Sequence, residues 1–157
     1  MKQGYDYVEM KIPAKPEYIS VIRLTLSGIA SRMGFTYEGI EDLKIAVSEA
    51  CTNAVQHAYA GAEAGEVVIG FGLYEDRLEV MVADKGDSCD FEQVRRDLGP
   101  YEEHHNVEFL REGGLGLYLI ETLMDKVSIH QSQGVTVFMT KFLEREQVEA
   151  DAKTIST

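Results

Sequence analysis

Three polar side chains recur at every fourth position of one segment: Glu49, Asn53 and His57. In a helix, residues four apart lie on the same face, with about 6 Å between neighbouring Cβ atoms. A carboxylate and an amide at the edge of an apolar helix face offer the oxygen ligands that Mg²⁺ prefers, and the carboxylate can also direct a nucleophile. The same spacing occurs in the solvated stripe of an ordinary amphipathic helix, so the spacing alone leaves both interpretations open.

A second candidate is the run Asp84-Lys85-Gly86, which follows a stretch of alternating apolar residues. An aspartate that ends a strand places a carboxylate at the edge of a sheet, where it can accept a hydrogen bond from an exocyclic amine. The glycine two positions later lets a flat ligand approach the backbone. The alternative is a plain turn at the exit of a strand.

Two glycine-containing motifs complete the set. Gly113, Gly114 and Gly116 precede a short apolar segment, and glycines before a helix expose backbone N–H groups to which a phosphate can bind. The motif lacks the Gly-Lys-Ser/Thr of a Walker loop, and close packing or a hinge also explains such glycines. Gly134-Val135-Thr136 opens the last apolar run, where a threonine is often just a strand former.

The elements that must position these residues follow from the apolar periodicity. Alternating apolar residues predict five strands, over residues 8–12, 67–73, 78–82, 126–132 and 135–142. Apolar residues at helical spacing predict three helices, over residues 16–33, 38–59 and 115–124. The first of these helices has apolar character on two faces, so we expect it to be deeply buried or to contact a partner.

This order of elements predicts an α+β fold. We expect a two-layer α/β sandwich in which helices cover one face of a mixed, mostly antiparallel sheet. The length of 157 residues suits one domain, which we place at residues 1–143, followed by a polar tail at 144–157. The polar stretch 84–112 is longer than an ordinary connection and is typical of a lid, a binding loop or a disordered segment.

The charge of the chain excludes several classes of partner. A net charge of −12 disfavours direct binding to nucleic acid or to an anionic membrane. Residues 1–33 nevertheless carry +2, which points to a protein partner that meets distinct faces. There is no signal-peptide pattern, no apolar run of membrane-spanning length, and only two cysteines. We therefore expect a soluble, cytoplasmic protein.

In this order, and each on its expected element, the four motifs resemble the ATP-binding domain shared by gyrase, Hsp90, histidine kinases and MutL, the Bergerat-type fold. The resemblance is carried by "EDLKIAVSEACTNAVQHAY", "DRLEVMVADKGDS", "EGGLGLYLIETLMDKV" and "GVTVFMTK". Within this superfamily the chain is most similar to the small anti-sigma factor kinases. The opening "YVEMKIPAKPEYISVIRLTLSGIASRMGFTYE" extends the similarity over nearly the whole chain.

The resemblance implies a role for each residue of the site. Glu49 would be the catalytic base for the hydroxyl of an acceptor serine, and Asn53 would link Mg²⁺ to the triphosphate of ATP. Asp84 would accept a hydrogen bond from the adenine amine, and Gly86 would allow the base to come close.

The glycine-rich segment and the last strand would complete the nucleotide site. Gly114 and Gly116 would let the backbone wrap the phosphates, and Thr136 would support the contact between Asp84 and adenine. His57 would lie at the periphery. One departure from the pattern is Ser88, which stands where many relatives carry a second glycine. Arg111 is left out of the site because the neighbouring Glu112 opposes its charge.

The resemblance also implies a function in partner switching. Such a protein would sequester the general-stress sigma-B factor, and with Mg²⁺ and ATP it would phosphorylate an anti-anti-sigma protein on serine. It would be a homodimer and would affect transcription without touching DNA. The alternative is a binding-only anti-sigma module for another sigma factor, for example in sporulation, in which the nucleotide is structural.

Overall fold

The computed structural model describes residues 4–59, 65–84, 91–92, 96, 116–132 and 134–144. The chain runs through β1 (Asp6–Pro13), a short 3-10 turn (Pro16–Tyr18), α1 (Ile19–Met33), α2 (Tyr37–Tyr59), β2 (Glu66–Leu73) and β3 (Arg77–Ala83). A helix over 116–123 follows, and then β4 (Lys126–Ser132) and β5 (Gly134–Phe142). The strands and helices predicted from periodicity are therefore all present.

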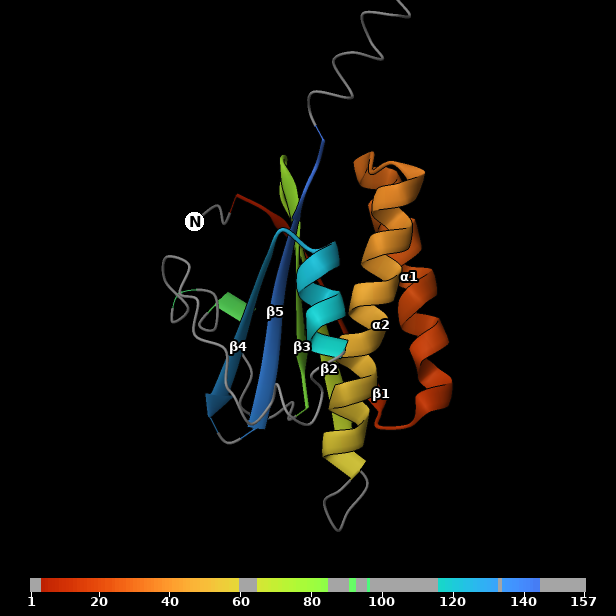
Figure 1. Cartoon of the computed structure of the whole chain (residues 1–157), viewed down its shortest axis with the longest axis vertical. Coiled ribbons are helices and arrows are strands. Elements are labelled where there is room, and N and C mark those ends of the chain that lie inside the picture. The colour runs from red at the N-terminus through yellow and green to blue at the C-terminus, as the bar shows by residue number, and fades with distance from the viewer. Residues whose placement is uncertain are drawn as a thin grey trace, which may run out of the picture.

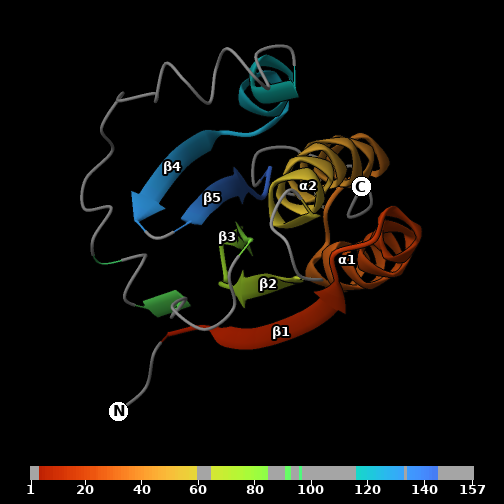
Figure 2. The same cartoon turned by 90° about the horizontal axis from the view of Figure 1, so that it is seen from below.

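The five strands form one sheet in the order β1-β2-β3-β5-β4 (Figure 1). The pairs β1–β2, β2–β3, β3–β5 and β4–β5 are all antiparallel, so the described sheet is antiparallel throughout rather than mixed. Both α1 and α2, together with the helix over 116–123, lie on the same side of this sheet (Figure 2). The predicted α+β sandwich is confirmed.

The main core lies between the sheet and the helices. Strand alternation sends Val67, Ile69 and Phe71 of β2 into this core, where each is fully buried. One face of α2 joins it through Leu43, Ala46, Val47, Ala50 and Ala54, all at most 8% exposed. The small side chains along this helix let α2 pack close to the sheet, and the polar residues of α2 remain at the flank of the buried face.

The first helix is buried on one side only. Ile22 and Leu26 of α1 are at most 1% exposed, whereas Leu24 is 75% and Val21 is 43% exposed. The helix stops at Gly34, whose φ of +97° is a left-handed conformation that glycine adopts without strain. The second apolar face predicted for this helix is thus open in the monomer.

The predicted tail begins at Glu144, and all of it beyond this residue lies outside the described part of the chain. The division at residues 143 and 144 stays a prediction. No helix among the described residues is long and apolar enough to cross a membrane.

Candidate functional site

Two predicted site residues lie at the flank of α2. Glu49 and Asn53 are half-buried and one helical turn apart, next to the fully buried Ala50 and the nearly buried Ala54. Their position follows from helical geometry, because the apolar neighbours hold one face against the sheet and leave these two side chains at its border. The side chain of His57 lies outside the described part of the structure.

Gly116, a third predicted site residue, lies beside the same two side chains. It is the first described residue of the helix over 116–123, which lies beside α2 (Figure 1). A Cβ atom at Gly116 would lie 3.0 Å from Oε2 of Glu49 and 3.7 Å from Nδ2 of Asn53. The backbone of Gly116 therefore approaches both polar side chains from an element more than 60 residues away in the sequence.

Asn53 carries unused hydrogen-bonding capacity. Its Nδ2 atom is buried and makes no hydrogen bond to any residue that the structure describes. An unpaired buried amide is costly, which favours a ligand that satisfies it. The N–H groups suit a phosphate oxygen and the carbonyl oxygen suits a hard cation, so this side chain fits a metal-bound triphosphate.

Asp84 stands at the end of β3 and is 9% exposed. Its Oδ1 atom accepts a hydrogen bond of 2.9 Å from the N–H of Val135, and its own N–H donates to the carbonyl oxygen of Val135 at 3.2 Å. The first bond orients the carboxylate and the second fixes the backbone of Asp84, and Oδ2 makes no hydrogen bond to the described residues. A buried carboxylate with one oxygen fixed and one available is suited to accept a hydrogen bond from an amine.

The structure does not bring Thr136 to Asp84 as the sequence led us to expect. Thr136 pairs with Ala83, one residue before Asp84, and it alternates with Val135 and Val137, which pack against the main core. The Thr136 side chain is buried, but strand alternation places it on the opposite face of the sheet. The residue that supports Asp84 is Val135, through its backbone.

The remaining predicted positions cannot be placed. Gly86 and Gly114 lie outside the described residues, as do Ser88 and Arg111. Of the seven predicted site residues, the structure therefore places Gly116 beside both Glu49 and Asn53.

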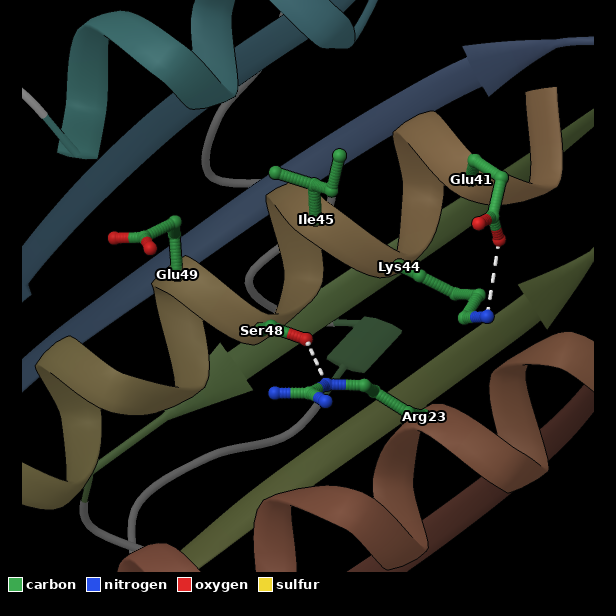
Figure 3. A pocket seen from close by; sticks show the side chains of 6 residues that line it. All are labelled: Arg23, Glu41, Lys44, Ile45, Ser48 and Glu49. Carbon is green, nitrogen blue, oxygen red and sulfur yellow. Dashed lines mark hydrogen bonds and ion pairs between the residues drawn. The ribbon is translucent and has the colours of Figure 1, made fainter. Parts of the chain in front are cut away.

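A hollow of about 280 Å³ lies between α1 and α2 and reaches Glu49 (Figure 3). The other side chains that line it are Arg23, Glu41, Lys44, Ile45 and Ser48. Arg23 of α1 donates from Nε to Oγ of Ser48 at 2.8 Å, and Lys44 pairs with Glu41 at 3.0 Å. Glu49 thus has two neighbours. On one side is Gly116 of the helix over 116–123, and on the other is an open, charged hollow along α2.

The sequence analysis did not single out Arg23, Lys44 or Ser48. One available signal was Arg23 itself, a cation between Ile22 and Leu24 in a helix that is apolar on two faces. A second was the position of Ser48 directly before the candidate base.

Two further observations concern the thiol of Cys51 and the binding of a metal ion. Cys51 is fully buried on α2, and burial raises the pKa of its thiol to about 12, so it is a core residue and a poor nucleophile. Within the described ranges there is no group of three or more His, Cys, Asp or Glu side chains that could hold a metal ion. A Mg²⁺ ion that enters with substrate phosphates needs no such cage, because it is commonly bound by one or two protein ligands.

The chain is similar in sequence to known proteins over nearly its whole length. Residues 12–141 match the histidine kinase-like ATPase domain. The chain is 66% identical to the serine-protein kinase RsbW of Bacillus subtilis strain 168, over 96% of this chain and 94% of the relative. It is 59% identical to the serine-protein kinase RsbW of Bacillus cereus strain ATCC 10987, over 100% of this chain and 98% of the relative.

A solved structure of the RsbU and RsbW domains of a Mycobacterium tuberculosis protein shares the fold, with a TM-score of 0.62 at 21% identity. It covers 88% of this chain, and this chain covers 32% of that longer one. From the extent of the sequence matches, the chain belongs to the family of the serine-protein kinase RsbW, within the histidine kinase-like ATPase domains.

Proposed function

We propose that the protein is an anti-sigma factor and a serine-protein kinase that uses ATP and Mg²⁺ to phosphorylate its anti-anti-sigma antagonist. The observation that carries the proposal is the close approach of the Gly116 backbone to Glu49 and Asn53, which leaves no room for a larger side chain, in a chain of this family. Phosphoryl transfer depends on positioning and on charge neutralisation, and here a carboxylate can orient the acceptor while an amide and nearby backbone can hold the phosphates.

Asp84 recognises the nucleotide base in this proposal. One carboxylate oxygen is held by the N–H of Val135, and the other accepts a hydrogen bond from the adenine amine. We assign the support of Asp84 to the backbone of Val135 and not to Thr136. Gly86 and Gly114 keep the roles that the family resemblance implies, close approach of the base and binding of the phosphates.

Glu49 serves as the catalytic base. The hydroxyl oxygen of the acceptor serine forms a bond to the γ-phosphorus, and the bond from that phosphorus to the bridging oxygen of ADP breaks. The proton of the serine passes to the Glu49 carboxylate. When bound, Mg²⁺ neutralises the charge of the phosphates, which matters in a chain of net charge −12. Asn53 is the protein group that would hold it.

The acceptor serine enters, in this proposal, through the hollow between α1 and α2. Glu49 lines this hollow and also faces Gly116, so one carboxylate is in reach of both sides. The serine must approach from a side that the nucleotide does not occupy, and the hollow meets this condition. Its charged lining is suited to polar backbone and side-chain groups of a protein segment.

The regulatory partners are sigma-B, the anti-anti-sigma protein and a second copy of the chain. We assign their contacts to the open apolar face of α1, where Leu24 and Val21 are exposed. An exposed apolar face on an otherwise acidic chain favours association with protein. We propose that the protein acts in the cytoplasm and reaches transcription only through the captured sigma factor.

The binding-only alternative is not favoured. The relatives at 59–66% identity are named as serine-protein kinases, and the Glu49 carboxylate is kept beside Asn53 and Gly116.

The proposal is tested by incubating the protein with Mg²⁺ and γ-labelled ATP together with purified candidate anti-anti-sigma proteins. Label should appear on one of them, and mass spectrometry should map it to a serine. A matched reaction with EDTA should give no transfer. Absence of transfer to every candidate, with ATP binding intact, would move the account to the binding-only alternative.

A further inference from the structure

Strand β1 forms one edge of the sheet. Among the described residues it pairs with β2 alone, over its full length from Asp6 to Pro13 and without a bulge. The outer N–H and C=O groups of such an edge can pair with another chain, and proteins often prevent this with short or bulged strands. Side chains on both faces of β1 are exposed, Tyr7 at 37% and Val8 at 38%. The strand is therefore accessible from outside the molecule.

Two opposite charges stand two residues apart on β1. Met10 and Ile12 pack in the main core, on the helix side of the sheet, so the alternate residues Glu9 and Lys11 lie on the face that the helices leave open. Both side chains are exposed, and neither takes part in an ion pair between described residues. The hydroxyl of Tyr7 donates to Oε1 of Glu9 at 2.8 Å and holds the carboxylate on this face.

The order of these charges makes β1 complementary to a second copy of itself. In an antiparallel pair of two β1 strands centred on Met10, Glu9 of each copy stands opposite Lys11 of the other. Opposite charges across a strand pair are stabilising, and a two-fold axis supplies this contact twice. A shift of the register by two residues would place Glu9 against Glu9 or Lys11 against Lys11. The charges therefore select the register that is centred on Met10.

The opposite edge of the sheet does not have this property. Among the described residues β4 also pairs with one strand only, β5. The sequence of β4, from Lys126 to Ser132, contains no acidic residue. No register between two copies of β4 can therefore bring opposite charges together.

The neighbouring helix adds apolar surface at the β1 edge. Of the helices, α1 lies nearest to β1 (Figure 2), and its Val21 and Leu24 are exposed. A pair of strands alone buries little area, whereas stable interfaces between proteins bury about 1,200–2,000 Å². The apolar face of α1 extends the contact that β1 begins.

We propose that two copies of the chain join their sheets through antiparallel β1 strands, in the register centred on Met10. The two sheets become one continuous sheet, with the helices of both copies on the same side. The inference rests on the proposed function, which counts a second copy of the chain among the partners, and it gives that partner a defined contact.

The test exchanges charges in the full chain and measures the dimer dissociation constant by sedimentation equilibrium. Glu9→Lys puts two lysines opposite each other at both contacts, and Lys11→Glu puts two glutamates there. Each variant alone should dimerise at least about tenfold more weakly than wild type. Mixed in equal amounts, the two variants should associate with an affinity near the wild-type value, because the lysines of one then face the glutamates of the other.

Two comparisons separate this contact from a general effect of charge. Glu9→Lys makes the acidic chain less acidic, so repulsion between whole molecules would predict stronger association of this variant, not weaker. Lys126→Glu is the matched control, since it makes the same change as Lys11→Glu at an exposed position of β4, on the other edge. It should leave the dissociation constant at the wild-type value.

A monomeric wild-type chain, unchanged association of both single variants, or no recovery in the mixture would overturn the inference. If a single variant does not fold, the double variant Glu9→Lys/Lys11→Glu decides, because it restores both contacts within one sequence and should dimerise as wild type does. The transfer of label from ATP to an anti-anti-sigma protein is measured separately. A failure of the proposed kinase function is therefore distinguishable from a failure of this contact.

Discussion

Single residues of the site differ in what holds them in place. Asp84 is fixed by two hydrogen bonds to the backbone of Val135, whereas Asn53 has a buried N–H group with no partner among the described residues. A fixed acceptor suits recognition of a base, and an unsatisfied amide suits a ligand that completes it. In the proposed function, Asp84 therefore contributes specificity for the base and Asn53 contributes phosphate binding.

Replacing Asp84 by Asn tests base recognition. Asn can keep the hydrogen bond from Val135 through its carbonyl oxygen, but it then presents an NH₂ group to the nucleotide. We expect ATP affinity to fall by at least about tenfold, because a charge-assisted hydrogen bond contributes ~1.5–3 kcal/mol. The preference for ATP over GTP should narrow, since the guanine carbonyl accepts from NH₂. Unchanged preference in a competition titration would contradict the role of Asp84.

Cys51 gives a prediction about pH. Burial raises the pKa of its thiol from 9.0 to about 12 in the folded protein. Between these values the unfolded chain loses this proton first, so the free energy of unfolding falls as the pH rises, and below pH 9 the thiol has no such effect. Denaturant unfolding at pH 8 and pH 10 should show a smaller decrease for Cys51→Ala than for wild type. Equal decreases in the free energy of unfolding of both proteins would contradict this role of the Cys51 thiol.

At the scale of elements, the site depends on how closely the helix over 116–123 packs against α2. Gly116 faces Glu49 and Asn53 so closely that even one added carbon would lie 3.0 Å from the carboxylate. The end of this helix is held by Lys141 of β5, whose Nζ donates to the carbonyl oxygen of Leu123 at 2.8 Å. A cation at the C-terminus of a helix is favourable, and here it ties the helix to the sheet.

Gly116→Val should therefore impair catalysis more than folding. The added carbons displace Glu49, and a misplacement of about 1 Å costs ~10²-fold in kcat/KM, whereas overpacking costs only ~1–3 kcal/mol of folding free energy. Gly28→Ala is the control, because nothing lies within 4 Å of the added carbon on the exposed side of α1. That change should raise the free energy of unfolding by ~0.5–1 kcal/mol and leave kinase activity intact. An equal loss of activity in both variants would contradict this account.

The elements were predictable from sequence because their apolar periodicity is strong. Alternation in β1 and helical spacing in α2 reflect burial of one face, which is a local pattern. The strand register is a different matter. A shift of one residue moves every side chain to the other face, so the sequence could not show that Val135, and not Thr136, stands beside Asp84. The approach of Gly116 to Glu49 depends on tertiary packing, for which no local pattern exists.

At the scale of the whole molecule, the protein has a catalytic flank on α2 and a separate apolar face on α1. Leu24 on that face is 75% exposed, although the chain as a whole is strongly acidic. Partner switching requires that partner binding and nucleotide binding occur on one molecule. The hollow between α1 and α2 is lined by residues of both helices, Arg23 and Glu49 among them.

Leu24→Glu should separate these functions. A buried charge in an apolar interface is costly. Association with a second copy or with sigma-B should therefore weaken by at least about tenfold, which corresponds to ~1.4 kcal/mol. The affinity for ATP should not change. Tyr37→Glu is the control, since Tyr37 is 77% exposed but lies at the start of α2. Sedimentation measures association with a second copy of the chain, and capture of purified sigma-B measures association with the sigma factor. Normal association in the Leu24 variant would exclude this face.

The central claim is that Glu49 takes the proton of the acceptor serine. The most direct measurement is single-turnover transfer of the γ-phosphate to the anti-anti-sigma protein by Glu49→Gln, compared with Glu41→Gln. Both glutamates line the same hollow on the same helix. We predict that Glu49→Gln binds ATP normally and slows transfer by ~10²–10⁴-fold, as loss of a general base does, and that Glu41→Gln retains the wild-type rate. Transfer at the wild-type rate by Glu49→Gln would contradict the claim.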